Sequence, residues 1–131
     1  MLETIARLVA IRETAKDIHY SANSDSFYGI HLLMDRVADD INDQIDSIKE
    51  VCFLGENALP PKSEEILKKA IDYIPSSENW KANLVVLQQL ILDTLNQISN
   101  LPFDFANANL MGNIAESLKL KLGLISRTVI K

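Results

Sequence analysis

Several residue types are scarce in this 131-residue chain, and each shortage narrows what it can be. The single cysteine excludes an internal disulfide and predicts a reducing, cytoplasmic setting. The longest apolar run, residues 84–92, is interrupted by two glutamines and is too short to span a bilayer. Basic residues number 13 against 18 acidic ones, and the resulting net charge of −5 argues against binding to nucleic acid or to a membrane surface.

What remains is a chain rich in leucine, isoleucine and alanine, 47% apolar and only 6% aromatic. This composition and length predict one globular domain over residues 1–131, with an all-α fold. Apolar residues recur at three- and four-residue steps, which predicts helices over residues 2–20, 27–54, 63–73, 78–99 and 107–131. Four of these are long and one is short. We therefore expect a four-helix bundle with a short helix in the connection between helices 2 and 3.

Both histidines of the chain fall into one spaced set with three carboxylates. The set is His19, His31, Asp35, Asp46 and Glu50. The last four lie on one predicted helix, outside its apolar stripe, and they form two pairs with i,i+4 spacing that brings each pair within one helical turn. Imidazole and carboxylate together are ligands for iron or zinc, so the set predicts a metal site.

The gap between the two pairs limits how such a site can be built. Asp35 and Asp46 are about 16 Å apart along a helix axis, whereas metal–ligand distances are about 2 Å. Either the pairs bind separate ions, or a second copy of the helix runs antiparallel to the first. A solvated acidic face that binds no metal is the plain alternative.

An antiparallel second copy fits the register of the two pairs. A two-fold axis near Asp40 and Ile41 places His31 and Asp35 of one chain opposite Asp46 and Glu50 of the other. An isologous dimer of this kind makes two identical sites between subunits. His19, at the end of the first predicted helix, could complete each site from the side of His31.

These residues resemble the metal-binding pattern of Dps-type mini-ferritins, a ferritin-like family. That pattern is Lys-x-x-His-Trp, a Phe eight positions after the His, a second His after twelve, an Asp four later, and Asp-x-x-x-Glu after a further eleven. Here the run reads Lys16-Asp-Ile-His19-Tyr20, then Phe27, His31, Asp35 and Asp46-Ser-Ile-Lys-Glu50. All five ligand positions match without gaps, while Tyr20 replaces the family's Trp and Ser24 a common Gly.

The resemblance implies a ferritin-like four-helix bundle that assembles as a two-fold dimer and further into a hollow dodecamer. It implies a ferroxidase site between subunits that oxidises Fe(II) with hydrogen peroxide or oxygen, stores Fe(III) and protects against peroxide. Glu50 is the candidate bridge between two irons, with His31, Asp35 and Asp46 on the tighter ion and His19 on the weaker. No basic tail precedes the first helix, so the DNA binding of some members is not expected.

Two other interpretations remain open from the residues. One is a non-catalytic ferritin-like assembly module whose metal, such as zinc in place of iron, is structural. The other is a helical scaffold without metal. Trp80 and Cys52 are expected to be core residues, since both fall on apolar faces of their predicted helices.

Overall fold

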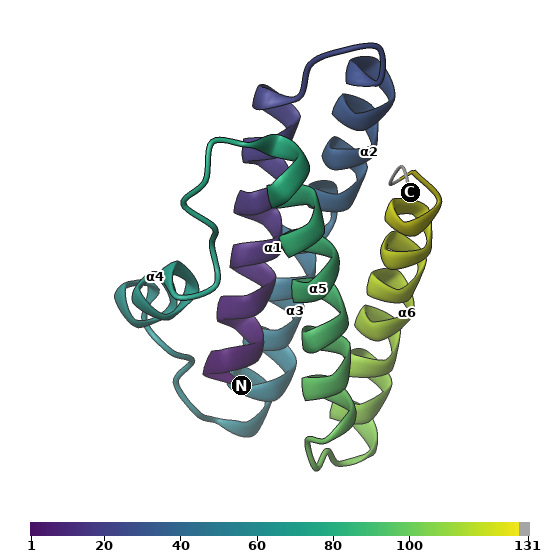
Figure 1. The fold of residues 1–131 in the computed structure, drawn as a ribbon. Coiled ribbons are helices and arrows are strands. Elements are labelled where there is room, and N and C mark those ends of the chain that lie inside the picture. Colours follow the sequence, from purple (N-terminus) through teal and green to yellow (C-terminus); the bar gives the residue numbers. More distant parts are fainter. Residues whose placement is uncertain (129–131) are drawn as a thin grey trace.

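The computed structural model describes residues 1–128, and within them the secondary structure is helical, without strands (Figure 1). Its elements are α1 (Leu2–Ser21), α2 (Phe27–Asp39), α3 (Ile41–Cys52), a 3-10 turn (Leu54–Glu56), α4 (Ser63–Ile71), α5 (Trp80–Ser99) and α6 (Phe105–Thr128). The all-α prediction is confirmed. The final three residues of the last predicted helix lie outside the described residues.

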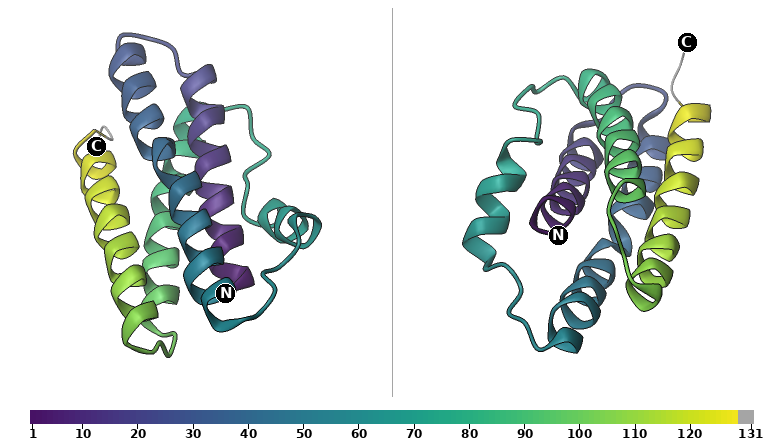
Figure 2. Two further views of the ribbon diagram at one scale, coloured as in Figure 1. Left: turned by 180° about the vertical axis from the view of Figure 1, so that it is seen from behind. Right: turned by 90° about the horizontal axis from the view of Figure 1, so that it is seen from below.

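The long helices lie side by side (Figure 1). α1 packs against α2, α3 and α5, and α6 packs against the same three elements from the other side. The segment between α3 and α5 carries the short helix α4, as predicted, and α4 packs on α1, away from α6 (Figure 2). Because this segment connects opposite ends of the molecule, α3 and α5 run in the same direction, whereas α1–α2 and α5–α6 are antiparallel pairs.

Helix α1 is more deeply enclosed than its sequence suggests. The apolar residues expected on one face, such as Ile5, Leu8 and Ile18, are buried, but so are Thr4 and Thr14. The extra burial arises because α1 is covered by α2, α3 and α5 and also by α4. Trp80 and Cys52 are buried too, as expected, and burial raises the pKa of the Cys52 thiol.

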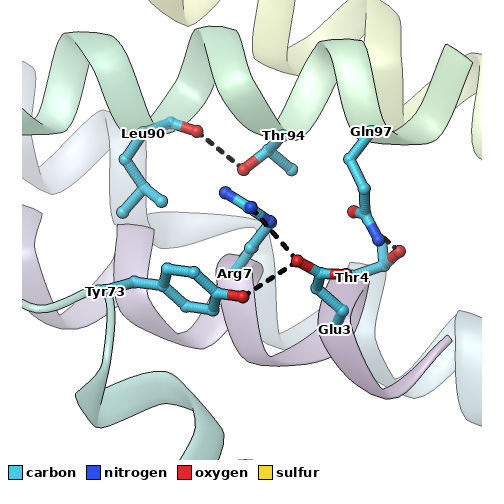
Figure 3. A network of polar contacts seen from close by, with 7 residues as sticks. All are labelled: Glu3, Thr4, Arg7, Tyr73, Leu90, Thr94 and Gln97. Atoms are coloured by element: carbon cyan, nitrogen blue, oxygen red, sulfur yellow. Dashed lines mark hydrogen bonds and ion pairs between the residues drawn. The ribbon is translucent and has the colours of Figure 1, made fainter.

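A polar network fastens the end of the α4 segment to α1 (Figure 3). The Tyr73 hydroxyl donates to the Glu3 carboxylate at 3.0 Å, and Arg7 donates to the same carboxylate at 3.2 Å. The Arg7 guanidinium also lies 4.4 Å from the centre of the Tyr73 ring. These hydrogen bonds lower the pKa of Glu3, while burial and the bond to Glu3 raise the pKa of Tyr73. The network holds α4 at a fixed place beside α1.

The helix predicted over residues 27–54 is interrupted, so that prediction is wrong at Asp40. Asp40 has φ −94° and ψ 0°, at the edge of the right-handed helical region, and it separates α2 from α3. Its carboxylate accepts hydrogen bonds from Lys121 and from Ser117, both on α6. The interruption thus coincides with polar contacts to α6, and the Asp40 carbonyl still accepts the Gln44 N–H at 3.1 Å.

The loop between α1 and α2 contains a strained residue. Ser24 has φ 77°, in the left-handed region that side chains other than glycine adopt at a cost. The Phe27 N–H closes a turn on the Ser24 carbonyl at 3.1 Å, and the Trp80 indole N–H donates to Asn23 at 3.1 Å. The strain is therefore built into the turn that joins the segments carrying His19 and His31.

We expect Ser24→Gly to raise the free energy of unfolding by up to about 1 kcal/mol, because glycine adopts positive φ without a steric penalty. Urea denaturation measures the change. Ser26→Gly is the matched control, since Ser26 has φ −87°, where glycine gains no steric relief. A stability of Ser24→Gly at or below that of the Ser26→Gly variant would contradict the argument.

Candidate functional site

His19 and His31 form a stacked pair where α1 meets α2. Their ring centroids are 3.6 Å apart and the planes are inclined by 16°. His19 lies near the end of α1 and His31 in the second turn of α2, so the short loop between the helices brings the rings together. Tyr20 contacts His19 edge-on, and the Phe27 ring lies 5.1 Å from that of His31. Both imidazoles are half-buried within this aromatic group.

Reciprocal hydrogen bonds define which nitrogens are free. His19 Nδ1 lies 2.7 Å from the carbonyl oxygen of His31, and His31 Nδ1 lies 2.8 Å from the carbonyl oxygen of His19. A carbonyl only accepts, so each Nδ1 must carry the proton and donate it. In each neutral imidazole the lone pair is then on Nε2. A backbone partner that fixes the tautomer and ring orientation is what metal-binding histidines have.

Asp35 follows His31 by one helical turn and is held by a lysine of α1. Lys16 Nζ lies 2.9 Å from Asp35 Oδ1. The hydrogen bond from Lys16 lowers the pKa of Asp35, with smaller contributions from the two histidines, and the same bond raises the pKa of Lys16. Asp35 is therefore an ionised, exposed carboxylate beside the imidazole pair. We name His19, His31 and Asp35 the histidine half-site.

Asp46 and Glu50 lie on α3, one turn apart, and both are exposed. We name them the carboxylate half-site. Asp46 borders a surface groove between α3 and α4, whose floor includes Ile45, Ile66 and Val9. The fixed position of α4 on α1 thus shapes the surface next to this half-site.

The chain keeps the two half-sites apart. Within residues 1–128, no three His, Cys, Asp or Glu side chains lie close enough together to hold one metal ion. His19, His31 and Asp35 lie along the contact between α1 and α2, with both rings oriented by backbone carbonyls, but the three are not close enough together to hold one ion. Asp46 and Glu50 lie apart from them on α3. A complete five-ligand site therefore needs groups from outside a single chain.

The sequence analysis assigns no role to two groups that position the site. Lys16 appears there only as part of the family pattern, although its place one turn before His19 puts it on the same face of α1. The Trp80–Asn23 hydrogen bond, which ties the loop between the histidines to α5, spans 57 residues and leaves no local pattern.

Comparison with known protein-family models and with characterised proteins finds no match to this chain. Within the described residues, none of the helices has the length and apolar character needed to cross a membrane.

Proposed function

We propose that this protein is a mini-ferritin of the Dps type, which binds Fe(II) between two copies of the chain, oxidises it and stores the Fe(III) product. The observation that carries the proposal is the histidine pair, in which both Nδ1 atoms donate to backbone carbonyls and both Nε2 lone pairs are left for a metal. The adjacent carboxylate of Asp35 supplies the hard ligand that iron also accepts.

The fold supports the same proposal. Two antiparallel helix pairs joined by one long crossing connection are the topology of ferritin-like bundles. α1 and α2 carry the histidine half-site, and α3, which continues the direction of α2, carries the carboxylate half-site. Antiparallel pairing of two copies along α2 and α3 would bring each histidine half-site to the carboxylate half-site of the other chain, and twelve chains would form the storage shell.

The proposed chemistry assigns a role to each ligand. Each Fe(II) loses one electron, and one hydrogen peroxide takes up two electrons and two protons to give two water molecules. Carboxylates favour Fe(III) over Fe(II), which lowers the reduction potential of bound iron and favours its oxidation. In this proposal Glu50 would contact both irons, His31, Asp35 and Asp46 would hold the tighter ion, and His19 would hold the weaker one.

The test is Fe(II) oxidation by hydrogen peroxide, followed in stopped flow. We expect His31→Ala combined with Asp35→Ala to slow oxidation at least about tenfold, because removal of even outer-shell partners costs about 10–100-fold. Asp93→Ala, an exposed carboxylate on α5, is the control and should leave the rate unchanged. A double variant that oxidises iron at the wild-type rate would disprove the ferroxidase proposal.

Circular dichroism of the same proteins distinguishes the ferroxidase proposal from the non-catalytic alternative. A protein that does not oxidise iron, but whose helical circular dichroism collapses in a chelator, would instead have a structural metal such as zinc. Gel filtration adds the assembly state, because a strict monomer could not form a site between chains.

A further inference from the structure

The groove beside Asp46 has a lining suited to an anion. It has a volume of about 420 Å³ and lies where α1, α3 and α4 meet, over an apolar floor. Its polar lining consists of five side chains, which are Arg12, Asn42, Asp46, Lys49 and Ser63. Two of them are cations and one is an acid, so the lining has a net positive charge in a chain whose net charge is −5.

Arg12 is held in a fixed position at this groove. Its Nε donates to the Glu13 carboxylate at 3.1 Å, and its Nη1 donates to the side-chain oxygen of Asn42 at 2.5 Å. Among residues 1–128, neither Arg12 Nη2 nor Asn42 Nδ2 has a hydrogen-bond partner of its own. A guanidinium that is already fixed and still has a free donor is well prepared to bind an oxyanion, because little side-chain entropy is lost on binding.

Lys49, on α3, supplies the second cation. In the described part of the chain, no carboxylate lies within ion-pair distance of its ammonium group, although Asp46 precedes it by one helical turn. Ser63, the first residue of α4, adds a hydroxyl donor. The hydrogen bond from Tyr73 to Glu3 helps to hold α4 beside α1, so the groove and its donors are preformed.

Asp46 determines which anion fits the groove. At neutral pH a carboxylate is ionised and only accepts hydrogen bonds, so it repels an anion that has no proton to donate. Phosphate keeps at least one P–O–H group at neutral pH, whereas sulfate, which has the same tetrahedral shape, is fully ionised. Several donors together with one acceptor therefore match hydrogen phosphate and disfavour sulfate.

We propose that this groove is a binding site for inorganic phosphate. Arg12 and Lys49 bind the anionic oxygens of the phosphate. Asn42 and Ser63 donate further hydrogen bonds, and Asp46 accepts a hydrogen bond from the P–O–H group. All five side chains belong to one chain, so the site needs neither a metal nor a second copy and does not depend on the proposed ferroxidase function.

Equilibrium dialysis with radiolabelled phosphate, and with radiolabelled sulfate at the same pH and ionic strength, tests the proposal. The protein is used metal-free, because Asp46 also belongs to the carboxylate half-site. We expect one phosphate per chain and at least about tenfold weaker binding of sulfate, in the range for hydrogen bonds to charged groups. Asp46→Asn should abolish this preference, because asparagine removes the negative charge and offers a donor.

Two lysine variants show whether binding occurs in the groove. Lys49→Gln removes a cation without breaking an ion pair, and it should weaken phosphate binding about tenfold or more. Lys81→Gln makes the same change in charge at an exposed position of α5 outside the groove, and it should leave phosphate binding unchanged. The absence of phosphate binding, equal affinity for sulfate, or equal weakening by both lysine variants would overturn the proposal. Oxidation of Fe(II) by the His31 and Asp35 variants is measured separately, so either proposal can fail without the other.

Discussion

Two inactive variants are expected to restore activity when mixed. One carries His31→Ala and Asp35→Ala, which removes most of the histidine half-site. The other carries Asp46→Ala and Glu50→Ala, which removes the carboxylate half-site. Each homodimer lacks a working site. In a mixed two-fold dimer, one site combines the intact half of each chain and the other combines both damaged halves.

The amount of activity that returns on mixing the two variants is specific to a site between chains. Random pairing makes half of the dimers mixed, and each mixed dimer has one of its two sites intact, so activity should return to about a quarter of wild type. The variants are denatured together and refolded, and native mass spectrometry measures the mixed fraction. A mixture with mixed dimers present but with activity at the level of the separate variants would show that the half-sites do not cooperate between chains.

The sequence predicts the helices well because its apolar periodicity is strong. The positions from Ile30 to Cys52 keep that period across Asp40, so nothing local marks the interruption there. The ion pair formed at the interruption joins Asp40 to Lys121, 81 residues away in the chain. Lys121 was a clue in the sequence to this contact, because a lysine within the apolar stripe of α6 needs an acidic partner once it is buried.

In the candidate site, too, features set within one helix could be predicted from the sequence, whereas features set by contacts between helices could not. Spacing alone separates the two half-sites, because the rise of a helix is fixed. The free Nε2 atoms could not be predicted, since they depend on how α1 and α2 pack: each imidazole reaches the carbonyl oxygen of the other histidine across the two helices.

The ion pair between Asp40 and Lys121 is expected to be a major and asymmetric contribution to stability. The Lys121 side chain is only 6% exposed, whereas that of Asp40 is 48% exposed. Asp40→Ala leaves a buried ammonium group without its partner, and we expect a loss of about 2–3 kcal/mol in the free energy of unfolding, in the range for hydrogen bonds to charged groups. Urea denaturation measures this loss.

The reverse substitution should cost less, because its consequences fall on an exposed group. Lys121→Met keeps most of the buried side-chain volume, and Asp40 remains partly solvated and still accepts from Ser117 and Gln44. We expect a loss under about 1 kcal/mol, since replacing a buried charge by an apolar chain of similar size is often nearly neutral. The double variant should then resemble Lys121→Met rather than Asp40→Ala, because no unpaired ammonium remains. Equal losses for the two single variants, adding up in the double variant, would mean that the pair does not act as a unit.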